Sequence, residues 1–310
     1  MKCGMVNIGF PDDKSIAENV FISIIAVLIH EHMINILYSL LLFSISFIGV
    51  TPSNHRSVRG ATTITDSLHW ISTSRGRIYI NAYKNDSLTQ KLNLVIIIHG
   101  DAPFNKPGYQ YRMAKIIAEQ NKNTIAIGLL RPGYTDPDNN KSDGKRGLTT
   151  GDNYGPEIIQ GIAEAVQQLK TIYHSRKTVL VGHSGGSAIT ADIIGLYPDL
   201  VNAAVIISCP CNLTSWRKYM GDKQPTVSAW HDSVNSISPN LVVEKISKSM
   251  QVYVITGEAD DVTPTGLSAD YDRQLKKEGI KSNLIRIPKE GHEVSFHDIV
   301  FTTVSGLLKN

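Results

Sequence analysis

Gly182-His183-Ser184-Gly185-Gly186 is the stretch that decides how this chain of 310 residues is interpreted. The β-branched run Lys177 to Val181 precedes it and predicts a strand, and the apolar segment Ser187 to Leu196 predicts a buried helix. Strand, G-x-S-x-G and helix form the context of a nucleophile elbow, whose glycines permit a tight, strained turn. Such a turn holds the Ser184 hydroxyl above the sheet, with the amide of Gly185 at a helix N-terminus. The alternative is a glycine-rich turn with an exposed serine that has no function.

Composition indicates an ordinary globular protein, because 42% of the residues are hydrophobic and 19% are charged. The length fits one large α/β domain or two small ones. A formal net charge of +3 is too small to indicate a nucleic-acid partner, and no basic stripe or RNA-binding motif is present. Cys3, Cys209 and Cys211 predict neither a disulfide framework nor a zinc site, and the last two are interpreted as small core residues after a strand.

The first sixty residues differ from the remainder of the chain. Ile36 to Val50 is apolar apart from three serines and fits the core of a signal peptide, although it is shorter than the ~18 residues of a membrane span. Two details disagree with a cleaved signal: no A-x-A-like site follows, and Arg56 and Arg59 lie after the apolar run. An uncleaved anchor is the alternative, and Met33 is an alternative start.

We therefore expect residues 1–60 to be a hydrophobic signal or anchor segment with a linker, and residues 61–310 to be the catalytic domain. This interpretation predicts that residues 36–50 associate with a membrane. It also predicts that the protein is exported or membrane-anchored, and periplasmic or secreted rather than cytoplasmic.

From residue 61 onward, strand patterns alternate with helix patterns. The predicted strands are 68–74, 77–83, 92–98, 124–130, 177–181, 202–208, 251–256 and 282–287, and the predicted helices include 158–172, 187–196, 268–277 and 296–308. The first two strands form an antiparallel hairpin, and the continuous apolar strands belong in a parallel sheet covered on both faces. The fold class is thus α/β, with a doubly wound, mostly parallel sheet and an antiparallel N-terminal hairpin. Residues 212–238 fit neither pattern and predict a small lid or loop over the site.

A serine hydroxyl becomes a nucleophile when a base takes its proton and an acid orients that base. Asp260 follows the predicted strand 251–256, and His292 follows the last predicted strand. Both therefore lie at carboxyl ends of strands, where open α/β sheets build their sites. Considered singly, Asp260 is as readily a helix cap and His292 a surface histidine. The order serine, acid, histidine in the right elements favours a catalytic triad.

As a set, the motifs resemble those of the α/β-hydrolase family over roughly residues 65 to 308. The motifs are His99-Gly100, Arg131-Pro132-Gly133-Tyr134, Gly182-His183-Ser184-Gly185-Gly186, Gly257-Glu258-Ala259-Asp260 with Pro264, and Gly291-His292. The resemblance implies that Ser184 is the nucleophile, His292 the general base and Asp260 its partner. The family spacing G-x-x-D-x-x-x-P selects Asp260 over Asp261. The amides of Gly185 and Asp101 would form the oxyanion hole.

Asp101 departs from the family, because many relatives have an apolar residue or glycine at this place. A carboxylate there repels a developing oxyanion unless it is neutralised or points away. Three alternatives are open: Asp101 pairs with Arg131, receives a cationic part of the substrate such as an amino group, or caps the next turn.

Four side chains are candidates for substrate binding, namely Arg131, Tyr134, Trp216 and Trp230. The two tryptophans lie in the insertion, where they wall an apolar pocket or simply pin the insertion to the domain. His183, within the elbow, is expected to pack rather than react.

The sequence thus predicts a serine hydrolase, carboxylesterase- or peptidase-like, that cleaves an ester, thioester or amide bond through an acyl-enzyme. Its partner is a small-molecule or peptide-like acyl substrate, and no metal or organic cofactor is implied because the triad serves both halves of the reaction. The alternatives are a cofactor-free haloperoxidase or perhydrolase with the same triad, and a catalytically silent α/β-hydrolase fold that serves as a binding module.

Overall fold

The computed structural model describes residues 62–63, 68–84, 88, 92–147 and 151–309. All of them belong to Val58–Asn310, one of the two units into which the chain divides. The predicted signal or anchor segment, with its membrane association and localisation, lies outside the described residues and stays a prediction. Within the described ranges, no helix is both long enough and apolar enough to cross a membrane.

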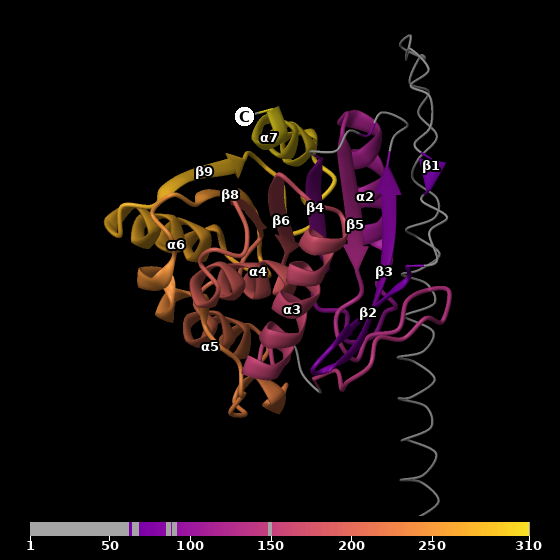
Figure 1. Ribbon diagram of the computed structural model, residues 1–310. Coiled ribbons are helices and arrows are strands. Elements are labelled where there is room, and N and C mark those ends of the chain that lie inside the picture. The colour runs from indigo at the N-terminus through magenta and orange to yellow at the C-terminus, as the bar shows by residue number, and fades with distance from the viewer. Residues whose placement is uncertain (1–61, 64–67, 85–87, 89–91, 148–150, 310) are drawn as a thin grey trace, which may run out of the picture. The chain divides into compact units, whose positions relative to one another are not determined.

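The described residues form a mixed sheet of nine strands (Figure 1). The strands are β1 (Thr62–Thr63), β2 (Trp70–Thr73), β3 (Gly76–Lys84), β4 (Asn93–Ile98), β5 (Thr124–Leu129), β6 (Lys177–His183), β7 (Ala203–Ile207), β8 (Gln251–Gly257) and β9 (Lys281–Ile287). Their order is β1-β3-β5-β4-β6-β7-β8-β9, with β2 paired to β3 beside this path. Neighbours from β5 to β9 run parallel, whereas β3 is antiparallel to β1, β2 and β5. The predicted doubly wound sheet with an antiparallel hairpin is therefore confirmed.

Helices cover both faces of the sheet, as the continuous apolar strands require. They are α2 (Tyr109–Gln120), α3 (Pro156–Ile172), α4 (Gly185–Leu196), α5 (Leu213–Lys223), α6 (Thr265–Lys277) and α7 (Asp298–Lys309), with short 3₁₀ turns at Ser228–Trp230, Pro239–Leu241 and Val243–Lys245. Alternate residues of β4 enter different cores: Ile96 joins residues of α3, α4 and α6, while Val95 and Ile97 join residues of α2 and α7. The period of two along the strand thus produces the two layers seen in Figure 1.

The expectation for two of the cysteines is right about their burial, but it missed the bond between them. Cys209 and Cys211 lie in the core, where they form a disulfide. The insertion is more ordered than a loop, because α5 occupies its first half, and the Asn212 side chain caps this helix by accepting from the Ser215 amide at 3.1 Å.

The carboxyl group of Asp192 lies in the core of the sheet and its helices. Asp192 of α4 is fully buried, and neither of its oxygens has a hydrogen-bond partner among the described residues. The hydroxyls of Ser268 and Tyr271 in α6 are likewise buried and without a partner within the described ranges. Burial raises the pKa of Asp192 well above its ordinary value, because the charged form loses its hydration.

The Asp192 carboxyl group should therefore lower stability as the pH rises. Its pKa is higher in the folded than in the unfolded chain, so the free energy of unfolding falls once the pH passes the unfolded value near 4. We expect Asp192→Asn to be more stable than wild type by about 1–3 kcal/mol at pH 8 and by much less at pH 4. Denaturant unfolding at both pH values measures this difference. Asp199→Asn, at an exposed position just after α4, is the matched control, and equal effects of the two variants would contradict the prediction.

Candidate active site

The parallel pairing of the strands brings the loops after β4, β6, β8 and β9 to one edge of the sheet. Ile98 at the end of β4 lies opposite Gly182 of β6. Gly257 at the end of β8 lies opposite Ile287 of β9. Because parallel strands end at the same edge, the loops that follow these strands meet there, at the place where open α/β sheets build their sites.

The turn between β6 and α4 holds Ser184 in a strained conformation. Its backbone has φ 53° and ψ −123°, a left-handed region that costs a residue other than glycine about 1–3 kcal/mol. Close packing maintains the turn, because a Cβ on Gly186 would lie 2.2 Å from the carbonyl oxygen of Ile98. The Ser184 amide donates to the Ile207 carbonyl of β7 at 2.9 Å, which fixes the other side of the turn. The predicted elbow is therefore present in the geometry.

The structure brings Ser184, His292 and Asp260 into one hydrogen-bonded line. Nε2 of His292 lies 3.0 Å from the Ser184 hydroxyl, and Nδ1 lies 3.0 and 3.1 Å from the two Asp260 oxygens. Since a carboxylate accepts only, Nδ1 carries the proton and Nε2 is left to accept from the serine. The side chain of Asp260 is fully buried and that of His292 is 11% exposed, so solvent competes little for these bonds.

Local hydrogen bonds hold Asp260 as an anion. The amides of Val262 and Thr263 donate to Oδ1 at 3.0 and 2.8 Å, and the Thr263 hydroxyl donates to Oδ2 at 2.9 Å. Burial alone raises the pKa of Asp260, but His292 and these amides outweigh it and leave that pKa below its ordinary value. Its neighbour Asp261 is 73% exposed and pairs with Lys223 at 2.6 Å, away from the histidine.

A second set of hydrogen bonds links the loop after β4 to the histidine loop. The Gly100 amide donates to the Tyr109 oxygen at 2.6 Å, and that hydroxyl lies 2.9 Å from Nδ1 of His183. Nε2 of His183 donates to the His292 carbonyl at 3.2 Å, and the Ser208 hydroxyl donates to the same carbonyl at 2.9 Å. Burial and the nearby His292 lower the pKa of His183 to about 4, so this ring is neutral at neutral pH. His183 packs, as expected, and it also positions the backbone of His292.

Of the three alternatives for Asp101, pairing with Arg131 is the one that the structure contains. Nη1 of Arg131 donates to Oδ1 at 2.9 Å, while the Tyr154 hydroxyl and the Gly151 amide donate to Oδ2, the latter at 3.1 Å. The carboxylate packs against the elbow, because a Cβ on Gly185 would lie 2.4 Å from Oδ1. The two residues predicted to supply the oxyanion-hole amides therefore lie side by side.

Three of the four predicted substrate-binding residues are buried, and contact of the set with substrate stays a prediction. Arg131, Tyr134 and Trp216 are 0%, 4% and 1% exposed, so they support loops rather than line an open surface. Trp216 donates through Nε1 to the Val262 carbonyl at 2.8 Å and packs edge-on against Trp230, which pins the insertion to the loop that carries Asp260. Trp230 is half-buried, and its contact with substrate stays a prediction.

One group of described side chains has the composition of a metal site, namely His183, His292 and Glu293. Both ring nitrogens of each histidine already have hydrogen-bond partners, which are Ser184, Asp260, Tyr109 and the His292 carbonyl. A metal ion would have to break the line from Ser184 to Asp260, so these residues fit proton transfer better than metal binding.

Comparison with known proteins gives the family. The prolyl oligopeptidase family matches residues 146–302, half of the chain, and this range contains Ser184, Asp260 and His292. The chain belongs to the prolyl oligopeptidase family. This result confirms the resemblance to the α/β-hydrolases and indicates a serine hydrolase that is peptidase- or esterase-like.

Curated relatives are longer than this chain. The acylamino-acid-releasing enzyme of Rattus norvegicus is 22% identical over 160 residues, and that of Homo sapiens is 24% identical over the same length. Each alignment covers 46% of this chain and 21% of the relative, so the chain matches about a fifth of the length of these enzymes.

Solved structures support the fold. The acylaminoacyl peptidase of Pyrococcus horikoshii matches with a TM-score of 0.60 at 14% identity, over 81% of this chain and 41% of that protein. Est1E from Butyrivibrio proteoclasticus, in a structure with ferulic acid bound, matches with a TM-score of 0.58 at 16% identity, over 77% of this chain and 97% of that protein.

Sequence reasoning missed several residues that hold this site. Tyr109 lies on α2 and Tyr154 lies in the loop before α3, and neither belongs to a motif that links it to the elbow. Thr263 lies inside the acid motif, where a hydroxyl three residues after an aspartate is a sign of a local turn bond. The long-range partners emerge only when the sheet brings the loops together.

The buried pair of Arg131 and Asp101 gives a stability prediction. Arg131→Met leaves the Asp101 carboxylate buried without its cation, and we expect a loss of about 3–5 kcal/mol in the free energy of unfolding. Asp101→Asn combined with Arg131→Met should lose less than Arg131→Met alone, because no unpaired charge remains. Denaturant unfolding measures all three proteins. As the control, Arg77→Met removes an exposed pair with Asp143 and should cost under about 1 kcal/mol. A double variant no more stable than Arg131→Met alone would sink the charge argument.

Proposed function

We propose that this chain cleaves an ester, thioester or amide bond through an acyl-enzyme intermediate on Ser184. The observation that carries the proposal is the line from Ser184 through His292 to Asp260, with contacts of 3.0 Å on both sides of the imidazole. In this geometry the histidine is in the tautomer that accepts the serine proton. The strained turn supports it, since it presents the hydroxyl at a helix N-terminus.

Each half of the reaction uses the same groups. Ser184 Oγ forms a bond to the carbonyl carbon while its proton passes to Nε2 of His292, and the carbonyl oxygen becomes an oxyanion. The amides of Gly185 and Asp101 stabilise that oxyanion. His292 then returns the proton to the leaving group as its bond breaks. Water repeats the sequence on the acyl-serine and releases the acid.

We propose small acyl or peptide-like compounds as the substrates. Support comes from two kinds of relatives, the acylaminoacyl peptidases and the esterases, which share the fold and differ in the bond that they cleave. The segment 212–238, which contains α5 between β7 and β8, packs on the loop that carries Asp260.

Loss of the nucleophile should abolish both turnover and covalent labelling. We expect Ser184→Ala to lower kcat on a p-nitrophenyl ester by about 10⁶-fold and to prevent reaction with a fluorophosphonate probe. Ser187→Ala is the matched control, because this hydroxyl binds the Ser184 carbonyl and does not contact His292. Turnover and labelling are compared on folded proteins of equal concentration. A folded wild-type protein that neither hydrolyses nor labels would instead be a silent binding module.

The two neighbouring aspartates should differ sharply. Asp260→Asn removes the acceptor that fixes the His292 tautomer, and we expect kcat to fall by about 10⁴-fold. Asp261→Asn, whose side chain faces solvent and Lys223, should keep activity within about twofold because it removes only an exposed ion pair. Steady-state kinetics of both variants on one ester make the comparison, and the reverse ranking would exclude Asp260 as the orienting acid.

A further inference from the structure

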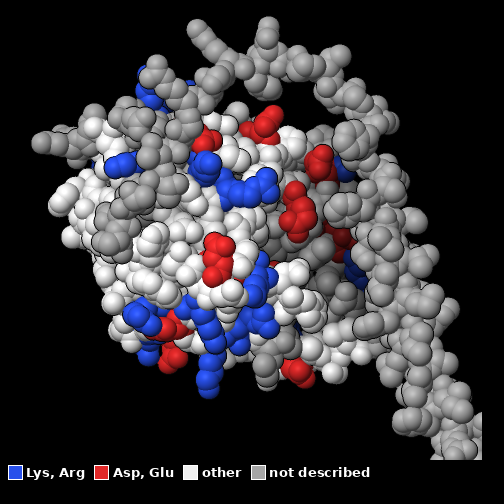
Figure 2. Space-filling model, turned by 90° about the vertical axis from the view of Figure 1, so that its right-hand side faces the viewer, with Lys and Arg blue, Asp and Glu red and all other residues white. Residues whose placement is uncertain are grey.

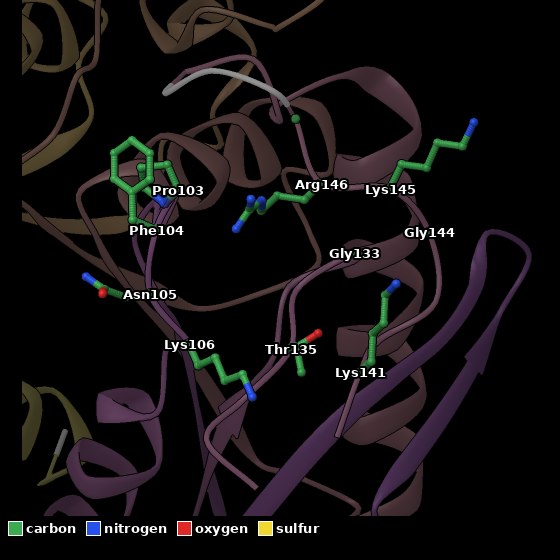
Figure 3. A pocket seen from close by; sticks show the side chains of 11 residues that line it. Pro103, Phe104, Asn105, Lys106, Gly133, Thr135, Lys141, Gly144, Lys145 and Arg146 are labelled. Carbon is green, nitrogen blue, oxygen red and sulfur yellow. The ribbon is translucent and has the colours of Figure 1, made fainter. Parts of the chain in front are cut away.

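A pocket of about 670 Å³ opens beside the loop that follows β4. Residues 103–106 form one wall, and the loop between β5 and α3 forms the others. Three cationic side chains line it, Lys106, Lys141 and Arg146, and no acidic residue is among its described lining. Lys145 also belongs to the lining, but its side chain points away from the pocket (Figure 3). Thr135 adds a hydroxyl to this lining.

Two of the acidic groups near the pocket already have partners within the fold. Asp143 lies between two of the cations in sequence, yet its carboxylate accepts from Arg77 at 3.2 Å. Asp136 is fully buried, and its oxygens accept from Tyr111 and Asn140. Figure 2 faces the side of the molecule that carries β3, and Lys and Arg side chains gather there in the lower half of the view.

Backbone contacts shape the pocket walls. The Ser142 amide donates to the Tyr134 carbonyl at 3.1 Å, and Thr135 forms an antiparallel bridge with Lys141, so this loop folds back on itself. Lys106 donates to the Asn139 side chain at 2.6 Å, which ties the opposite wall to the loop. Figure 3 shows Arg146 reaching toward the wall of Pro103 and Phe104 and Lys106 reaching toward Thr135, whereas Lys145 points away from the pocket.

The pocket lies close to the reacting centre. Its wall begins at Pro103, two residues after Asp101, and two residues span at most about 7 Å. Arg146 donates to the carbonyl of Ala102, the residue between them, at 3.1 Å. A group two to three residues' length from a carbonyl in the oxyanion hole can therefore reach Arg146, on the near side of the pocket. Phe104, which is 95% exposed on this wall, offers an apolar face to the intervening spacer.

We propose that this pocket binds an anionic group of the substrate, a carboxylate or a phosphate joined by a short spacer to the scissile carbonyl. The proposal rests on the proposed function and deepens it, since it gives the substrate a negative charge. Cations held together repel one another, and an anion relieves this repulsion. Their exposure makes the attraction sensitive to salt.

A pair of matched esters tests the preference. Mono-p-nitrophenyl pimelate carries a free carboxylate, and methyl p-nitrophenyl pimelate has the same acyl length and leaving group without the charge. We expect the anionic ester to have about a tenfold higher kcat/KM at low salt, and this ratio to shrink at high salt. Lys106→Gln and Lys141→Gln should each lower the ratio by about two- to fivefold.

A second arm places the charge on the leaving group. The kcat/KM of acetyl-Ala-Ala with a free carboxyl-terminus is compared with that of its amide, in wild type and in Lys106→Gln and Lys141→Gln. Preference for the charged compound in either arm supports the proposal and identifies the side of the scissile bond that the pocket serves. Lys145→Gln is the control of equal charge change in the same loop, because its side chain points away. Equal kcat/KM values for charged and neutral compounds in both arms overturn the proposal. It is also overturned if Lys145→Gln lowers the ratio of these values as much as Lys106→Gln and Lys141→Gln do.

The experiments distinguish a wrong acyl-enzyme proposal from a wrong proposal of anion binding in the pocket. If wild type hydrolyses none of the four compounds, the acyl-enzyme proposal fails, and the pocket is then tested by binding alone. Calorimetric titration of the full chain with monomethyl pimelate, beside the Lys106→Gln, Lys141→Gln double variant, gives this readout. Binding that the double variant loses supports the pocket, and absence of binding to wild type overturns it.

Discussion

The close approach of α4 to the end of β4 is the constraint on which the site depends. The helix begins so near the Ile98 carbonyl that only a glycine fits at position 186, and this packing forces Ser184 into a left-handed backbone conformation. The strain is small beside the packing of a buried helix between continuous apolar strands. The position of the hydroxyl is therefore set by the core rather than by the flexible loops around it.

Hydrogen bonds then transmit this fixed position to the other loops. Gly100, Tyr109 and His183 connect the loop after β4 to the backbone of His292, whose ring meets Ser184. Trp216 connects the insertion to the loop of Asp260. Each loop is thus held by a partner from a distant part of the chain, and the neutral ring of His183 lets this chain of bonds persist without a buried charge.

The sequence predicted those features that follow from local pattern. The run from Lys177 to Leu196 contains its own strand, turn and helix, so the elbow was visible without the structure. The acid motif even distinguished Asp260 from Asp261 by spacing. In contrast, Tyr154 and Arg131 meet Asp101 across some 30 to 53 residues, and no periodicity encodes such a contact. The disulfide of Cys209 and Cys211 was missed because two cysteines alone make no framework.

Charge balance explains how an aspartate is tolerated beside the predicted oxyanion hole. Oδ1 of Asp101 accepts from Arg131, and Oδ2 accepts from Tyr154 and Gly151, so the carboxylate is compensated within the fold. Two nitrogens of Arg131, Nε and Nη2, have no hydrogen-bond partner among the described residues, and its guanidinium instead lies 5.0 Å from the Tyr134 ring centre. The buried pair of Arg131 and Asp101 therefore has no net charge, and two N–H groups of Arg131 are left without an acceptor among the described residues. The cations of the pocket lie outside this pair, and no acidic residue is among the described residues that line the pocket with them, so their charge faces the space that a ligand would occupy.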